Sequence, residues 1–239
     1  MKIKNWKWAF ILVMINCCQF LILTNVAMLF YPGGTITDPN TSGYSLWKNL
    51  FSDLGRYITP SGDSNLISFV LYNISLFLMG ALFIPYFMAM PQLFKNREGN
   101  KVEGRGFSIA GSIIGIPIAI SMVGASLTPA DLLYAIHVSF GFIKFILLIP
   151  QVFLYSMAIL QNRIYPNRFA YFFIIFGVMQ LIFVLIMFFS VSQEELSNIF
   201  AAGQNIVIYA MTICYLIEGY GAWKLMKFHS LENVLRSLE

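Results

Sequence analysis

Six long apolar runs constrain this 239-residue chain more than any other feature of its sequence. Each run can cross a hydrocarbon core of about 30 Å as an α-helix, which rises about 1.5 Å per residue. Backbone groups in lipid need partners within the chain, so the runs must be helical. We therefore predict an all-α integral membrane protein, a six-transmembrane-helix bundle forming a single membrane domain, 1–239. The predicted spans are Trp8–Phe30, Leu66–Met90, Phe107–Leu127, Leu132–Ile159, Phe169–Ser190 and Ile199–Trp223.

The composition agrees with a membrane protein. Only 11% of the residues are charged and 58% are hydrophobic, whereas a soluble domain carries roughly a quarter charged residues. All three cysteines lie within the apolar runs, so no disulfide framework is expected in the loops. Gly111 and Gly115 in the third run form a small-xxx-small pattern, which predicts a close helix contact on that face.

The distribution of Lys and Arg predicts the orientation. One side carries Lys2, Lys4, Lys7, Lys95, Arg97, Lys101, Arg105, Arg163, Arg168, Lys224, Lys227 and Arg236, and the other side carries only Lys48 and Arg56. The side rich in basic residues faces the cytoplasm in membrane proteins. We expect a multi-pass protein of the plasma membrane with both termini in the cytoplasm. Topology already explains these basic residues, so they give no reason to expect nucleic-acid binding.

The longest predicted outer loop runs from Tyr31 to Asn65. Its apolar residues Leu46, Trp47, Leu50, Phe51 and Leu54 follow helical spacing. The pattern predicts a short amphipathic helix from Ser45 to Leu54 that lies on the outer interface or folds over the bundle as a lid. Gly55 would end this helix as a left-handed cap.

Short motifs in this loop and at the fourth span resemble a known family. They are Phe51-Ser52-Asp53-Leu54-Gly55-Arg56, then Leu127-Thr128-Pro129-Ala130-Asp131, and His137. Together they resemble the prokaryotic six-span membrane family named domain of unknown function 998, and the overall plan is similar to the Frag1/DRAM/Sfk1 membrane proteins. The resemblance implies a six-helix bundle with an ordered outer loop and brings no reaction. The Frag1 relatives are associated with lipid-anchor and membrane-lipid processes, which suggests membrane lipids as partners.

Three polar residues are candidates for ligand binding at the outer half. Asp53 can accept from a ligand hydroxyl or ammonium, and Arg56 can grip a phosphate or carboxylate. The same two residues can instead be an ion pair that ties the loop down. His137 lies inside the fourth span, where it can serve a ligand or an interhelical hydrogen bond. Asp131 is expected to be structural, at the third position of a helix that starts at Thr128.

Lys144 and Glu218 form a candidate intramembrane polar pair. Lys144 follows His137 at helical spacing in the fourth span, and charged residues in spans face the bundle interior or a cavity. Glu218 in the last span is the acid placed to neutralise it. Whether the two side chains meet is left open by the sequence, and Lys144 can instead bind an anionic ligand or backbone carbonyls.

The leading hypothesis is a membrane protein that binds a lipid or small amphiphile at its extracytoplasmic half. The first alternative is a metal-independent enzyme acting on a lipid headgroup, with His137 as base or acid and Asp53 as its orienter. A transporter, small-solute or proton-coupled, that uses Lys144 and Glu218 is the second, and a membrane scaffold is the third. With two histidines the chain cannot assemble a three-histidine zinc site, and it has no dinucleotide or phosphate-loop motif, so no metal or cofactor is expected. The ligand and the oligomeric state stay open.

Overall fold

The chain folds into six long helices. The computed structural model describes residues 6–95, 102–190 and 197–236, with the side chains of the last helix described to residue 227. Within these residues six helices are long and apolar enough to cross a membrane, which confirms the predicted all-α fold. They are α1 (Lys7–Leu29), α2 (Leu66–Ala89), α3 (Arg105–Ser126), α4 (Tyr134–Gln161), α5 (Asn167–Ser190) and α6 (Ser197–Arg236); two short 3₁₀ helices, η1 (Phe51–Gly55) and η2 (Met90–Gln92), join them.

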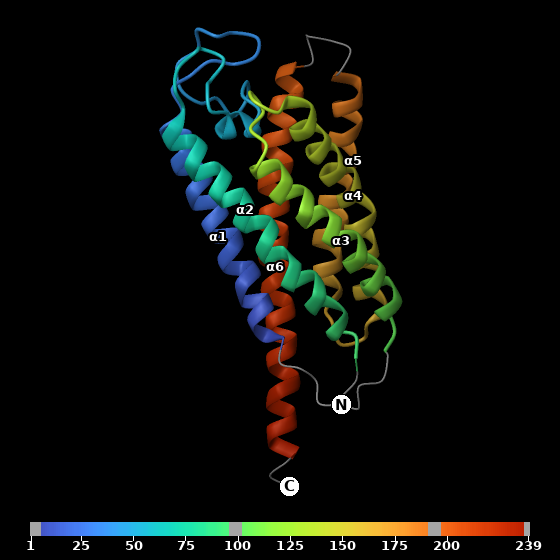
Figure 1. Ribbon diagram of the computed structural model, residues 1–239. Coiled ribbons are helices and arrows are strands. Elements are labelled where there is room, and N and C mark those ends of the chain that lie inside the picture. The colour runs from blue at the N-terminus through green and yellow to red at the C-terminus, as the bar shows by residue number, and fades with distance from the viewer. Residues whose placement is uncertain (1–5, 96–101, 191–196, 237–239) are drawn as a thin grey trace.

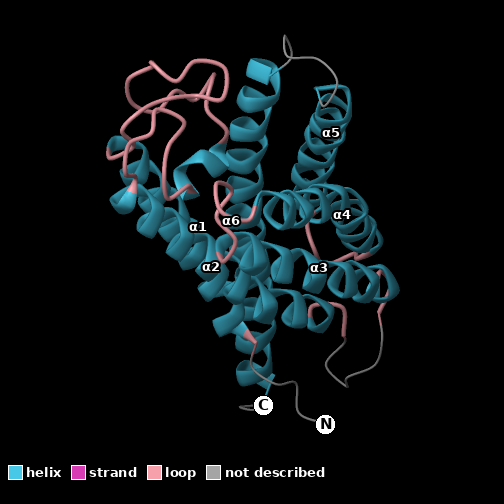
Figure 2. Ribbon diagram, turned by 45° about the horizontal axis from the view of Figure 1, so that its top comes forward, coloured by secondary structure: helices cyan, strands magenta, loops and turns pink. Residues whose placement is uncertain are grey.

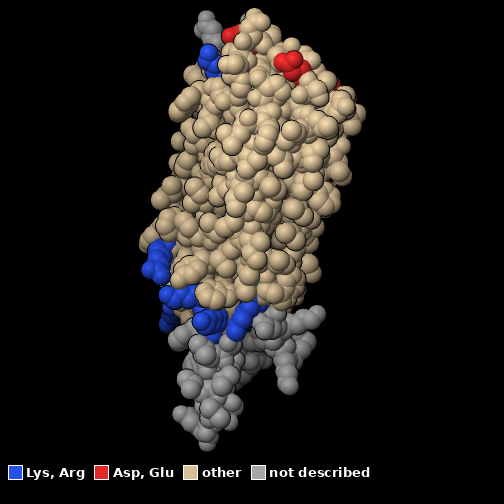
Figure 3. All heavy atoms as spheres, turned by 90° about the vertical axis from the view of Figure 1, so that its left-hand side faces the viewer, with Lys and Arg blue, Asp and Glu red and all other residues tan. Residues whose placement is uncertain are grey.

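The helices form a closed ring in sequence order. Each helix packs chiefly against its two neighbours along the chain, and α6 closes the ring by packing on α1. The beginning of α1 and the end of α6 lie at the same end of the bundle (Figure 1). Lys and Arg side chains gather at this end, and the acidic side chains in view lie at the opposite one (Figure 3). We call the first the basic end. The opposite one, which carries residues 31–65 (Figure 2), is the loop end.

Aromatic side chains fill the interior of the ring toward the basic end. This aromatic cluster consists of Phe83, Tyr86, Phe87, Tyr155, Phe173 and Tyr215, all buried. Neighbouring rings meet at centroid distances from 4.8 to 6.5 Å, mostly tilted or edge to face, as aromatic pairs prefer. A Cβ on Gly111 would lie 2.7 Å from the Tyr155 ring, and one on Gly115 would lie 2.5 Å from the Phe87 ring. The small residues of α3 therefore make room for the cluster.

The segment predicted as an amphipathic helix has a different structure. Residues 46–48 form a turn, and only Phe51–Gly55 is helical, as the 3₁₀ helix η1. Asn49 accepts from the backbone N–H of Ser45 (3.0 Å), and Asp53 accepts from that of Leu50 (3.0 Å). Such side-chain bonds compete with the backbone bonds of an α-helix. Gly55 is needed for space rather than as a left-handed cap, since its Cβ would lie 2.6 Å from the Tyr72 ring.

Phe51 anchors η1 in the loop end of the bundle. Its side chain is fully buried and contacts the rings of Phe20, Tyr72 and Tyr209 at centroid distances of 5.8 to 5.9 Å. Its backbone N–H donates to the side-chain oxygen of Gln204 on α6, at 2.8 Å. The loop therefore plugs the interior of the ring instead of lying beside it.

The structural role predicted for Asp131, in the first turn of the fourth span, is also different in the structure. Helix α4 begins at Tyr134, so Asp131 precedes it and does not cap its first turn. Its carboxylate instead accepts the backbone N–H of Tyr57 (3.0 Å to each oxygen) and that of Ile58 (2.8 Å). Pro129 starts a turn before α4, with its carbonyl accepting from the N–H groups of residues 132 and 133. The acid thus ties the outer loop to the α3–α4 connection.

Replacing Asp131 should loosen this part of the loop. In Asp131→Ala the amides of Tyr57 and Ile58 lose a charged acceptor, which for partly exposed groups costs about 1 kcal/mol. We expect faster hydrogen exchange at these two amides, measured by mass spectrometry. Asp63→Ala is the matched control, because the Asp63 carboxylate accepts from the nearby Ser61 hydroxyl within its own turn. Equal exchange at residues 57 and 58 in both variants would contradict the anchoring role.

Candidate functional site

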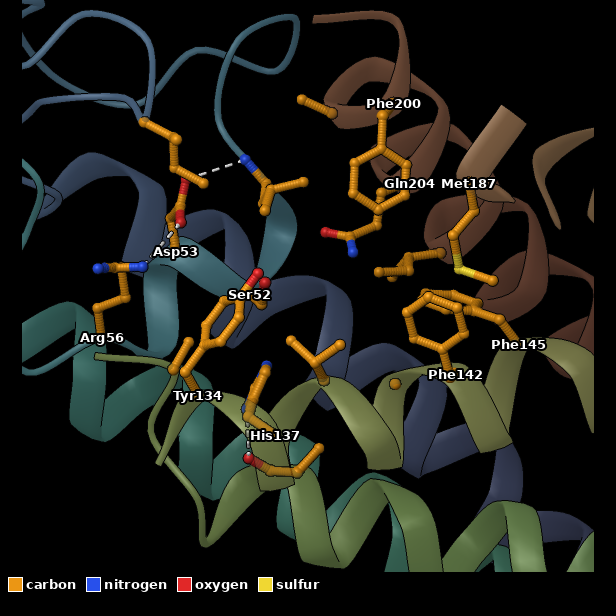
Figure 4. A pocket seen from close by; sticks show the side chains of 18 of the residues that line it. Ser52, Asp53, Arg56, Tyr134, His137, Phe142, Phe145, Met187, Phe200 and Gln204 are labelled. Carbon is orange, nitrogen blue, oxygen red and sulfur yellow. Dashed lines mark hydrogen bonds and ion pairs between the residues drawn. The ribbon is translucent and has the colours of Figure 1, made fainter. Parts of the chain in front are cut away.

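A cavity of about 490 Å³ opens at the loop end of the ring. Its walls come from the outer loop, α2, α4, α5, α6 and the α3–α4 connection. Figure 4 shows polar side chains at one side of it and apolar ones at the other. The polar side includes Ser52, Asp53, Arg56, Tyr134 and His137, and the apolar side includes Phe142, Phe145, Met187 and Phe200. The cavity therefore has the two-sided chemistry of an amphiphile.

The cavity brings together most of the residues singled out from the sequence. Asp53, Arg56, His137 and Lys144 all line it, although they come from two segments about 80 residues apart. Glu218 lies elsewhere, toward the basic end. The three predicted ligand contacts thus line the same cavity as Lys144. Glu218, the predicted partner of Lys144, does not line it.

Asp53 is buried and mostly engaged by its own loop. One carboxylate oxygen accepts from the Leu50 N–H (3.0 Å) and the Asn49 side-chain amide (3.2 Å). The other lies 3.9 Å from a guanidinium nitrogen of Arg56. Burial raises the pKa of Asp53 to about 6, although the Asn49 and Leu50 hydrogen bonds and the charge of Arg56 act in the opposite direction. Asp53 organises the polar side of the cavity more than it offers free acceptors to a ligand.

Arg56 lines the cavity and has few partners within the described chain. Its side chain is about 20% exposed, and among the described residues its one hydrogen bond runs from Nε to the Ile58 carbonyl at 3.4 Å. Lys48, on the same loop, also lines the cavity. Two of the cations at the loop end therefore face the same space, where either can pair with an anionic group.

His137 presents a defined nitrogen to the cavity. Its Nδ1 lies 2.7 Å from the carbonyl oxygen of Thr128 and 3.2 Å from that of Ala125. A carbonyl only accepts, so Nδ1 carries the proton and Nε2 of the neutral ring is an acceptor. Figure 4 shows the ring directed into the cavity. The two carbonyls orient the His137 ring. The enzyme hypothesis had assigned this orienting role to Asp53.

Lys144 and Glu218 do not contact each other. Among the described residues the ion pairs within 4 Å are Arg56–Asp53 and Arg163–Glu103. Glu218 accepts from the Tyr165 hydroxyl at 3.3 Å, and its other carboxylate oxygen has no hydrogen-bond partner there. Ile208, also on α6, lines the cavity with Lys144, and Glu218 lies ten residues farther along, or about 15 Å. The aromatic cluster occupies this interval.

Some residues of the site were not identified from the sequence. Gln204 was not among the candidate ligand contacts; it holds the loop and lines the cavity. Gly141 leaves space in the wall, since a Cβ there would meet nothing within 4 Å. Lys48 also lines the cavity, from a segment that forms a turn rather than the predicted helix. The sequence did contain a signal for Lys48. Basic residues are rare on the predicted outer side, where Lys48 and Arg56 are the two that occur.

Comparison of the chain with known protein families, curated proteins and solved structures finds no match. In the part of the chain that the structure describes, no three His, Cys, Asp or Glu side chains are grouped so as to hold a metal ion. Function must therefore be inferred from the cavity and its own residues.

The buried Asp53 predicts a pH dependence of stability. Its pKa in the folded chain, about 6, exceeds the ordinary 3.8, so between these values the folded state binds more protons than the unfolded state. The free energy of unfolding then decreases as the pH rises from about 4 to about 6, and this contribution is lost above that range. We expect the thermal midpoint of purified protein to fall across this window, and to fall less in Asp53→Asn. Asp63→Asn, an exposed carboxyl of the same loop, should behave as wild type; identical pH profiles for wild type and Asp53→Asn would contradict the shift.

Proposed function

We propose that the protein binds a lipid or small amphiphile in the loop-end cavity. The observation that carries this proposal is the division of one cavity into a polar side beneath the outer loop and an aromatic and aliphatic side between α4, α5 and α6. Its volume of about 490 Å³ lies within the roughly 300–1,000 Å³ range of small-molecule sites. Arg56 would donate to the polar group of the ligand and Nε2 of His137 would accept from a hydroxyl on it, while Asp53 would hold the loop above it.

The surroundings of the cavity support a ligand that arrives from the membrane or from the side of the loop end. It lies within a bundle of six helices suited to a bilayer. The aromatic cluster lies between the cavity and the basic end, where its rings pack against one another. This arrangement favours binding over passage of a solute across the bundle. With the orientation predicted from Lys and Arg, the site would face the extracytoplasmic leaflet.

A larger side chain at Gly141 should block the site without disturbing the fold. A leucine there would project into the cavity, because nothing lies within 4 Å of its Cβ position. We expect native mass spectrometry with lipid extraction to find a defined species on wild type that is absent from Gly141→Leu. Gly106→Leu is the matched control, since Gly106 is also unobstructed and lies at the opposite end of the bundle on α3. No retained species on wild type, or equal retention in Gly141→Leu, would overturn the proposal.

A second candidate function is a metal-independent reaction on a lipid headgroup. The orientation of His137 favours it, because an Nε2 acceptor facing the cavity is the arrangement of a general base. Ser52, Arg56 and Tyr134 line the same side. The enzymatic hypothesis requires the same amphiphile site and, in addition, chemical conversion of the bound lipid.

His137→Asn separates binding from catalysis. Its side-chain amide retains a hydrogen-bonding group but cannot take up a proton near neutral pH. If the protein is an enzyme, we expect the variant to retain the extracted species while its conversion falls by at least about 100-fold, the scale of general acid–base catalysis. Conversion that is unchanged in the variant, or absent from wild type, would remove the enzymatic reading and leave the binding function.

A further inference from the structure

Lys144 is a buried cation without a counter-charge among the residues that the structure describes. It lies on the cavity face of α4, two helical turns beyond His137, and its side chain is about 9% exposed. Its ammonium lies 4.0 Å from the centroid of the Phe145 ring. Among the described residues no carboxylate lies within 4 Å of it, and no hydrogen-bond acceptor contacts it.

The interactions that Lys144 makes do not offset its burial. Removing an ammonium from water costs several kcal/mol even after the protein relaxes, whereas a desolvated cation–π contact returns about 2 kcal/mol or somewhat more. Charged residues in spans therefore pair with another group or line a cavity. Lys144 lines a cavity, so the contents of that cavity are where a partner for its charge is to be sought.

The two nearest candidates within the chain are already engaged. Asp53 accepts from Leu50 and Asn49 and lies beside Arg56. Glu218 accepts from Tyr165 and lies beyond the aromatic cluster. Of the described residues that line the cavity, three are cations (Lys48, Arg56 and Lys144) and one is an acid, so positive charge predominates among them.

We infer that the ligand of this cavity is an anionic amphiphile whose carboxylate or phosphate group pairs with Lys144. The inference rests on the proposed binding function and names its ligand class. His137 helps to place the anion, because its Nε2 is an acceptor and repels an oxygen anion, whereas the Lys144 ammonium has three donors. The alkyl part of the ligand would contact Phe142, Phe145 and Met187.

The test compares ligands that share one chain length and differ in their head. Laurate, dodecyl phosphate and dodecanol are titrated against the full-length protein in a neutral detergent, with inorganic phosphate as the probe without a chain. We expect wild type to bind at least one of the two alkyl anions about tenfold or more tightly than dodecanol, the scale of one charge-assisted contact. Comparing laurate with dodecyl phosphate distinguishes a carboxylate from a phosphate ligand. If inorganic phosphate binds as tightly as dodecyl phosphate, the cavity is a simple anion site. This result would overturn the proposal of an amphiphilic ligand.

Variants of Lys144 assign the preference to this residue. Lys144→Met should lose the preference for the anion while keeping its affinity for dodecanol, and Lys144→Arg should retain the preference. Lys144→Gln is the second neutral variant if the methionine variant does not fold, and Lys224→Met is the control at the exposed basic end. A preference that survives both neutral variants would overturn the role of Lys144.

The outcomes separate the two proposals. Equal binding of dodecanol and the alkyl anions by wild type would overturn the anionic ligand and leave an amphiphile site. Binding of none of the alkyl compounds would overturn the proposed function itself.

Discussion

Backbone hydrogen bonding within a bilayer is the constraint on which this structure depends. In hydrocarbon the chain must satisfy its own N–H and C=O groups, so every long apolar run becomes a helix. Helices joined by short connections then pack beside their neighbours in sequence, and six of them close into a ring. The ring encloses an interior. Where side chains leave part of that interior unfilled, a cavity for a ligand remains.

The two ends of the interior are filled differently. Toward the basic end, large aromatic rings on α2, α4, α5 and α6 meet, and the small residues of α3 admit them. Toward the loop end the same helices carry smaller or polar groups at the interior positions, among them Gly141, His137 and Ala201. The interior there is closed by η1 through Phe51 but not filled, which leaves the cavity. The cavity therefore lies between the aromatic cluster and the outer loop. This position suits a ligand with one apolar and one polar part.

Polar side chains take the place of disulfides in holding the outer loop. Asp131 binds two backbone amides, and Gln204 binds a third. Asn205 donates to the Asn49 carbonyl at 2.9 Å and accepts from the Tyr44 hydroxyl at 2.8 Å. These bonds join the loop to two different parts of the ring. They also give Gln204 and Asn205 of α6 a structural role, whereas the buried charges of Lys144 and Glu218 take no part in holding the loop.

The sequence by itself determined the helices, because length, apolarity and the need to satisfy the backbone are properties of each segment alone. The boundaries agree within two residues except at the end of α6, which continues as a helix to Arg236, 13 residues beyond the predicted span. The sequence also singled out Asp53, Arg56, His137 and Lys144, since polar groups in an apolar chain are costly and need a reason. Only the tertiary structure decided which of them meet. Asp131 and Tyr57 are 74 residues apart, and no local pattern reveals that their bond replaces a helix cap. The separation of Lys144 from Glu218 likewise depends on where each lies along its own helix, and the side chains packed between them hold the two charges apart.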